Sequence, residues 1–162
     1  MAIQIVLIGI GATISIDLWA VLLRLVFGVG SLDYCLLGRW VLHMPQRRIF
    51  HESIATAERR RHECKVGWAA HYSIGVLFAA VFVALVSEAW LHRPTLLPSA
   101  AFGIATVLVP FLTMQPAFGL GIAASRTPRP WAARFKSLMT HTVFGLGLFV
   151  SAVLVAAASA RP

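Results

Sequence analysis

Residues 66–91 form a nearly unbroken apolar stretch that leaves few folds open to this chain. As an α-helix the stretch would be roughly 39 Å long, enough to cross the ~30 Å hydrocarbon core of a bilayer with some tilt. Trp68 and Trp90 lie near its ends, where tryptophan rings favour the headgroup level. A single histidine, His71, lies between them. We therefore predict a membrane-spanning helix that carries a histidine.

Three further stretches, 3–27, 96–124 and 131–158, are apolar in the same way. Hydrophobic residues make up 59% of the chain and the mean hydropathy is +0.80, whereas soluble domains are about 45–50% apolar. The apolar residues come in long runs, which favours helices over the alternating strands of a barrel. We predict an all-α polytopic membrane protein, a single membrane domain over 1–162 built as a four-transmembrane-helix bundle. The first span is expected to be retained, because it lacks the basic start of a cleavable signal peptide.

Lysines and arginines are distributed unevenly between the loops. Eleven lie in the first loop (28–65) or between the third span and the foot of the fourth, against two, Arg93 and Arg161, in the other loop and at the C-terminus. The positive-inside rule then predicts a bacterial inner-membrane protein with a cytoplasmic loop 28–65 and both termini outside. This topology accounts for the net charge of +8, and no nucleic-acid-binding motif accompanies the charge, so we expect no nucleic-acid partner.

The first half of the long loop has an apolar stripe at helical spacing. Its members stand four residues apart: Leu32, Leu36, Trp40 and Met44. Such a stripe predicts a short helix lying in the membrane interface, ended by Pro45.

The second half of the loop is predicted to form another helix over 54–63, with Ser53 as its cap. The basic run 59–61 is expected to face anionic headgroups or water.

The cysteines and histidines of this loop are interpreted as solvated. Cys35 and Cys64 are expected to stay reduced, because cytoplasmic thiols rarely form disulfides. His43, His51 and His62 are expected to belong to a solvated basic loop rather than to a metal cluster.

The third stretch contains two prolines at positions where a helix would be broken. Pro110 and Pro116 each remove a helical hydrogen bond and free the carbonyl four residues earlier, those of Thr106 and Leu112. Backbone freed at membrane depth needs another partner. Gln115 stands beside the break.

Each predicted span carries one polar residue that lipid tolerates poorly: Asp17, His71, Gln115 and His141. Such residues are expected to face the bundle and find partners. Three interpretations remain open. The residues join helices as polar glue, they form a buried site for proton or cation movement beside the broken helix, or His71 and His141, with Asp17, bind a haem or a transition metal.

Enzyme motifs are missing from the sequence. We find no Walker loop, nucleophile elbow, zinc-protease helix or dinucleotide fingerprint, so we expect no enzymatic activity, no catalytic residue and no cofactor. The leading hypothesis is a small inner-membrane protein whose buried polar cluster supports proton or cation movement. The alternatives are an accessory or structural subunit and a haem- or metal-binding membrane protein. The expected partners are the lipid bilayer and, because the chain is small, further copies or a larger membrane complex.

Several segments together resemble a known family. The segments SLDYCLLGRWVLHM, GWAAHYSIG and QPAFGLGIAASRTPRPWAAR are similar to the DUF2938 family of uncharacterised bacterial integral-membrane proteins. The resemblance covers nearly the whole chain. It implies a small polytopic membrane protein and carries over no activity and no site residues.

Overall fold

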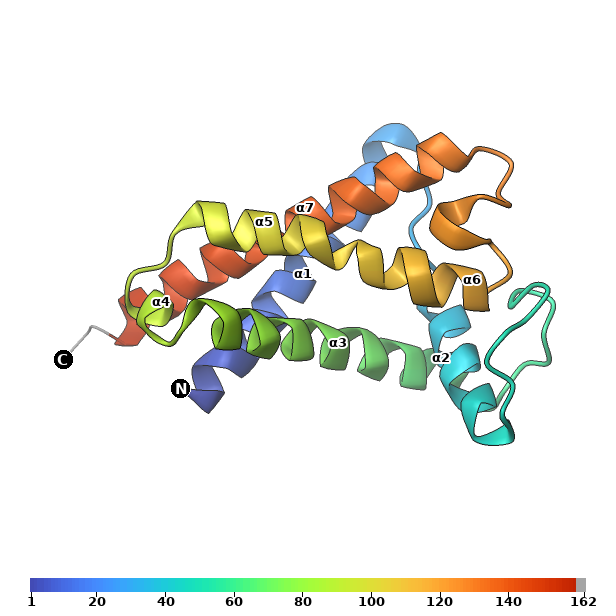
Figure 1. Cartoon of the computed structure of the whole chain (residues 1–162), viewed down its shortest axis with the longest axis horizontal. Helices are drawn as coiled ribbons and strands as arrows, with labels where there is room; N and C mark the ends of the chain where they lie inside the picture. Colours follow the sequence, from blue (N-terminus) through green and yellow to red (C-terminus); the bar gives the residue numbers. More distant parts are fainter. Residues whose placement is uncertain (160–162) are drawn as a thin grey trace. The chain divides into compact units, whose positions relative to one another are not determined.

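The computed structural model describes residues 1–159, and Arg161 lies outside them. The described chain is helical and contains no strand over residues 1–159. Four of its helices are long and apolar enough to cross a membrane: Ala2–Phe27, Glu63–Val86, Leu96–Ala117 and Pro130–Ser159. Figure 1 shows them as the long coiled ribbons. The predicted all-α, four-span fold class is confirmed.

These four helices keep most of their apolar side chains on the outside. Only 22–28% of the most apolar window of each helix is buried within the protein. Leu18, Leu25, Leu85 and Leu97 are among the large apolar side chains left exposed. Water would not tolerate so much continuous apolar surface, so hydrocarbon is the environment that fits these helices.

The chain divides into two compact units. The first unit comprises Met1–Ser31, Tyr72–Thr106 and the chain from Met139. It contains α1 (Ala2–Phe27), most of α3 (Glu63–Val86), α4 (Ala89–His92), α5 (Leu96–Thr106) and most of α7 (Pro130–Ser159). Its core is formed by ten buried side chains, among them Ile8, Phe82, Trp90, Phe144 and Leu148.

Glycines let the helices of the first unit approach closely. Gly9 of α1 lies against the backbone of α3 at Gly75 and Val76, and Gly103 of α5 lies against Gly145 of α7. A Cβ at Gly9, Gly103 or Gly145 would meet backbone atoms of the partner helix. Close approach of this kind is how helices associate in lipid, where no hydrophobic effect drives them together.

The second span ends earlier than residue 91. α3 stops at Val86, Ser87 takes a left-handed conformation with φ 74°, and α4 follows as a separate short helix. Trp90 therefore lies in α4, where it is buried against Phe82 with the ring centroids 4.7 Å apart.

The second unit comprises Leu32–His71 and Val107–Leu138. It contains α2 (Tyr34–His43), a 3-10 turn (Met44–Gln46), the start of α3, a π-helical turn (Pro110–Met114), α6 (Gln115–Ala117), a second 3-10 turn (Ile122–Ala124) and the start of α7. The prediction of a short helix ended at Pro45 is close to α2. Of the predicted stripe, Leu32, Leu36 and Trp40 pack against a buried cluster of Ile54, Ala117 and Phe118, whereas Met44 is exposed. The location of α2 in the membrane interface stays a prediction.

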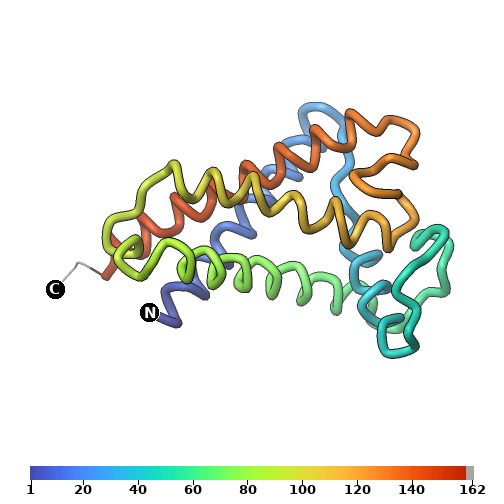
Figure 2. Tube along the Cα trace, in the orientation of Figure 1, coloured from blue at the N-terminus to red at the C-terminus, as the bar shows by residue number. Residues whose placement is uncertain are grey.

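The predicted helix over 54–63 is wrong. Residues 47–62 form turns and irregular backbone, which Figure 2 shows as a trace without coils after α2. This segment is nevertheless anchored within the second unit, because the His51 amide donates to the Ala117 carbonyl (2.9 Å) and the Ile54 amide to the Phe118 carbonyl (3.2 Å).

Candidate functional site

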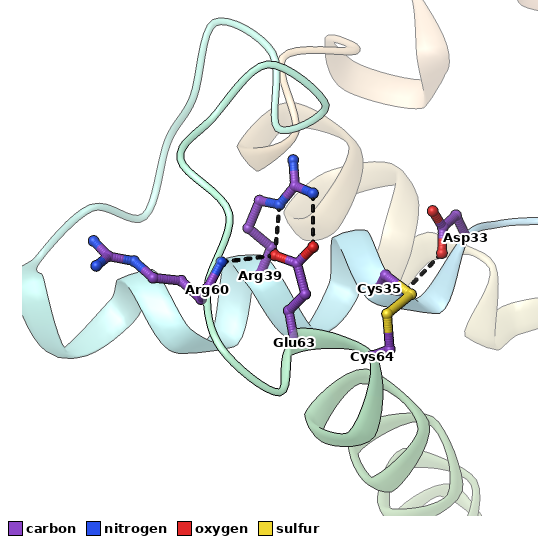
Figure 3. The surroundings of a disulfide bond; sticks show 6 residues. All are labelled: Asp33, Cys35, Arg39, Arg60, Glu63 and Cys64. Carbon is purple, nitrogen blue, oxygen red and sulfur yellow. Dashed lines mark hydrogen bonds and ion pairs between the residues drawn. A yellow bond between two sulfur atoms is a disulfide. The ribbon is translucent and has the colours of Figure 1, made fainter.

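A buried ion pair joins α2 to the first residue of α3. The Nε atom of Arg39 donates to Oε2 of Glu63 at 2.9 Å, and Nη2 donates to Oε1 at 2.8 Å (Figure 3). The two side chains are only 5% and 11% exposed. The Arg60 amide adds a third hydrogen bond to Glu63, at 2.9 Å. Bidentate pairing between an arginine and a carboxylate is among the strongest forms of charge-assisted hydrogen bonding.

The remaining nitrogen of Arg39 binds the backbone at the start of the segment that was predicted to be helical. Its Nη1 atom donates to the carbonyls of Ile54 (3.0 Å), Ala55 (3.0 Å) and Ala57 (3.2 Å). These are carbonyls that a helix starting at residue 54 would need for its own hydrogen bonds. The hydrogen bonds to Glu63 also raise the pKa of Arg39 above its already high value. The permanently charged guanidinium of Arg39 therefore holds the backbone of residues 54–57 in place.

The crossing of α2 and α3 requires two glycines. A Cβ at Gly38 would meet the backbone of Glu63, and a Cβ at Gly67 would meet the backbone of Tyr34. Both helices begin with the same short motif, Cys-x-x-Gly, as CLLG over 35–38 and CKVG over 64–67. Arg39 follows the first motif and Glu63 precedes the second. This repeated pattern is the sequence signal that could have revealed the helix pair.

The two cysteines of these motifs form a disulfide, Cys35–Cys64, between the first turns of α2 and α3 (Figure 3). The prediction that both thiols are reduced is therefore wrong for the state that the structure shows, although Cys64 is exposed as predicted and Cys35 is partly exposed. The physical reason is the glycine crossing, which brings the first turns of the two helices together and leaves the two sulfur atoms adjacent.

His71, the histidine of the second span, lies one helical turn beyond Gly67. Its ring stacks on Tyr34, with centroids 4.0 Å apart and an interplanar angle of 22°. Trp68 packs edge-on against Tyr34, with centroids 4.6 Å apart. His71 thus belongs to a cluster of three rings beside the α2–α3 crossing.

His43 and His51 form a hydrogen-bonded pair at the end of α2. His43 Nδ1 lies 2.8 Å from His51 Nε2, and His43 Nε2 lies 3.1 Å from the Glu58 carbonyl. Because a carbonyl only accepts, Nε2 of His43 carries its proton, and His51 donates to Nδ1. His43 is 1% exposed, so the prediction of a solvated histidine is wrong for it. Burial, and then the nearby charge of Arg60, lower the pKa of His43 below 6.5.

An open cavity of about 600 Å³ lies beside this pair. Its lining residues are apolar, basic and acidic, and they come from the loop after α2, from α6 and from the chain that follows α6: Phe50, His51, Glu52, Pro116, Gly121, Ile122, Ser125 and Arg126.

Two of the predicted buried polar residues lie in the first unit, and each is bonded to a hydroxyl of another helix. Tyr72 of α3 donates to Asp17 of α1 at 2.8 Å. His141 of α7 lies 2.8 Å from the Thr106 hydroxyl of α5. That hydroxyl donates its only proton to the Gly103 carbonyl at 2.6 Å, so Nδ1 of His141 carries the proton of the His141–Thr106 bond.

Gln115 lies in the second unit, where the third span is broken. Helical hydrogen bonding loosens to a π-helical turn at Pro110–Met114, and the Gln115 amide donates to the Pro110 carbonyl. Gln115 is 6% exposed. Its Nε2 atom donates to the Ser137 hydroxyl at 3.4 Å, while its buried Oε1 atom has no hydrogen-bond partner among residues 1–159. Single π-helical turns are frequent at functional sites.

The four predicted residues thus have separate surroundings. Asp17 and His141 belong to the first unit, and His71 and Gln115 to the second, so their convergence in one site stays a prediction. Within the described part of the chain, no group of three or more His, Cys, Asp or Glu side chains is arranged to hold a metal ion. The prediction omitted Tyr72 and Thr106, the hydroxyl partners, because common hydroxyl residues carry no spacing signal.

Comparison with known proteins gives one match. A family model described as a protein of unknown function, DUF2938, matches residues 6–155. No curated protein and no solved structure matches the chain.

Replacing Arg39 by Met should destabilise the protein by about 3–5 kcal/mol, because it leaves the buried Glu63 carboxylate without its counter-charge. Thermal unfolding of the purified protein in detergent measures the loss. The double variant Arg39→Met/Glu63→Leu should recover only part of it, since the carbonyls of Ala55 and Ala57 still lack the donor that Arg39 supplied. Arg59→Met, in the exposed part of the loop, is the matched control and should change stability by less than about 0.5 kcal/mol. Equal stability of the Arg39 and Arg59 variants would contradict the role of Arg39 as the counter-charge of buried Glu63.

The loop 47–62 should lose stability as the pH falls below 6.5. The pKa of His43 is lowered in the folded loop, so acid protonates the open loop first and favours opening, by up to about tenfold per pH unit for one proton. Hydrogen exchange of this segment, corrected for the intrinsic rate, measures the effect between about pH 7.5 and about pH 5.5. His43→Gln should flatten the response, and His62→Gln, at an exposed position, should leave it unchanged. Protection that is independent of pH in the wild type would show that His43 does not control the loop.

Proposed function

This chain belongs to the DUF2938 family, and from its geometry we propose that it supports the movement of protons or small cations past the broken third span. Four apolar helices make it compatible with a multi-pass membrane protein. The family description names no activity, so the proposal rests on the side chains alone.

The observation that carries the proposal is the buried, unpartnered Oε1 atom of Gln115. A buried carbonyl oxygen without a donor costs about 1–3 kcal/mol. Such a cost is tolerated where the oxygen serves a ligand that comes and goes, and a water molecule or a small cation is the ligand that an amide oxygen accepts. The π-helical turn and the two prolines beside Gln115 resemble the discontinuous helices from which transporters build their sites.

Two bonded pairs in the first unit supply titratable groups for the same process. Asp17 accepts a hydrogen bond from Tyr72, and His141 shares one with Thr106. Carboxylate and imidazole groups inside membrane helices are expensive and commonly mark proton relays. We propose Asp17 and His141 as the groups that exchange protons, and Gln115 as the group that holds water or a cation.

The proposal includes an orientation. The loop 28–65 lies in the cytoplasm and both termini lie outside a bacterial inner membrane, as the distribution of Lys and Arg favours. The exposed arginines of the second unit then meet anionic headgroups. The cavity lined by Arg126, Phe50 and Ile122 supports such contacts, because it offers a positive charge beside apolar side chains.

A second candidate is a non-catalytic accessory or structural subunit. It is favoured by the same two pairs, since Tyr72–Asp17 and Thr106–His141 each connect two helices of the first unit. Bonds of this kind stabilise helix association by about 1 kcal/mol each whether or not protons move.

Ion flux into liposomes distinguishes the two candidates. The wild-type protein, reconstituted with an internal pH-sensitive dye under a potassium diffusion potential, should acidify the lumen faster than protein-free vesicles. Gln115→Leu and Asp17→Asn should reduce the rate to the protein-free level. Gln4→Leu, near the start of α1 and outside both pairs, should leave it unchanged.

Two outcomes would contradict the proposal. Wild-type flux equal to that of protein-free vesicles under both proton and sodium gradients, together with lower detergent stability of Asp17→Asn, would favour the accessory subunit. A Soret band in the purified protein would favour the haem-binding alternative.

A further inference from the structure

The disulfide Cys35–Cys64 closes a joint that other contacts already hold. At the same crossing of α2 and α3, Arg39 pairs with Glu63 and Tyr34 stacks on His71. Gly38 and Gly67 bring the two backbones together. Opening the sulfur–sulfur bond therefore leaves both cysteines in place as neighbours, which favours rapid closing of the bond again.

The two sulfurs occupy positions that suit thiol exchange. Cys64 is exposed and Cys35 is partly exposed. Each is the second residue of its helix, α2 (Tyr34–His43) or α3 (Glu63–Val86). The N-terminal end of a helix favours the thiolate, which is the reactive form of cysteine.

In the orientation proposed above, this pair lies in a compartment where disulfides do not normally persist. The inference rests on the orientation proposed above, in which the loop 28–65 is cytoplasmic because of its seven Lys and Arg residues. Cytosolic disulfides are usually transient and serve catalysis or redox sensing. The fold holds Cys35 and Cys64 close enough to form a disulfide. In the proposed orientation they face the cytoplasm, which keeps thiols reduced, so their disulfide has the properties of a reversible bond.

We propose that Cys35 and Cys64 form a thiol–disulfide switch on the cytoplasmic side of the membrane. A small-molecule disulfide closes the switch, and a cytosolic dithiol reopens it. Closing the switch ties the ends of the loop together over a separation of 29 residues.

The exchange balances as an ordinary two-step reaction. The Cys64 thiolate attacks one sulfur of a small disulfide RSSR, forming a mixed disulfide and releasing RS⁻. The Cys35 thiolate then attacks the Cys64 sulfur, forming Cys35–Cys64 and releasing the second RS⁻. The two protons of the cysteine thiols end on the two released RSH molecules, so the protein loses two electrons and RSSR gains them. A cytosolic dithiol reverses the sequence and leaves as its own disulfide.

Mass-tagging of free thiols in cells that express the full chain tests the switch. Cells are quenched in acid, and a maleimide–polyethylene glycol reagent then adds one tag to each cysteine whose thiol is free. The chain has two cysteines. We expect two tags in resting cells, none after treatment with diamide, and two again after the oxidant is washed out. The variants Cys35→Ser and Cys64→Ser should each carry one tag before and after diamide, unless a small thiol caps the remaining cysteine, in which case dithiothreitol restores the tag.

The opposite results overturn the proposal. No tag in resting wild-type cells would show a permanent structural disulfide, and two tags after diamide would show that the thiols do not pair. A permanent disulfide that a membrane-impermeant phosphine opens in intact cells would also place the loop outside and refute the proposed orientation. The flux comparison between wild type and Asp17→Asn is measured in the presence of reductant, so failure of the switch is separable from failure of ion movement.

Discussion

The guanidinium of Arg39 organises the second unit, because each of its nitrogen atoms has a definite partner. A buried charge is expensive unless its neighbours replace water completely. Two oxygens of Glu63 and three backbone carbonyls do so here. Three carbonyls within residues 54–57 bond to Arg39, and this segment is not helical. These bonds fix the path of the second half of the loop 47–62, although the loop contains only short turns and irregular backbone.

The same requirement acts in the apolar helices, where the absence of water makes it stricter. Asp17 and His141 are each bonded to a hydroxyl from another helix, and glycines allow the helices to come close enough for such bonds. Two buried atoms of these helices have no hydrogen-bond partner within residues 1–159, Nε1 of Trp19 in α1 and Oε1 of Gln115. Of the two residues, only Gln115 belongs to the broken third span. It lies where two prolines and a π-helical turn have already disturbed the backbone. An unsatisfied group and a broken helix in one place are more simply explained by a ligand site than by two independent defects.

The spans were predictable from sequence because hydrophobicity summed over twenty residues leaves no alternative to a membrane helix. The loop was not, because its structure depends on single pairings between residues far apart in the chain. In the sequence Arg39 is one basic residue among several, and nothing there shows that it pairs with Glu63. Likewise, nothing shows that Leu36 and Trp40 pack against the buried cluster of Ile54, Ala117 and Phe118. The cysteines were expected to be reduced because the only available argument was the predicted cytoplasmic location of their loop. Their separation depends instead on the close crossing of α2 and α3 at Gly38 and Gly67. The polar residues Asp17, His71, Gln115 and His141 were found as exceptions to apolar runs, but no pattern in the sequence could supply their partners Tyr72, Tyr34, Ser137 and Thr106.

The measurement that most directly tests the role of Arg39 is the exchange of its guanidinium protons with water. In an NMR experiment on protein labelled with ¹⁵N-arginine in detergent micelles, the Nε–H signal of Arg39 should be resolved and should exchange slowly at neutral pH, because it donates to buried Glu63. The Nε–H signals of exposed Arg47 and Arg59 should exchange much faster under the same conditions. An Arg39 signal that exchanges as fast as those two, and that is unchanged in Glu63→Gln, would show that the guanidinium is solvated and that something else orders the loop.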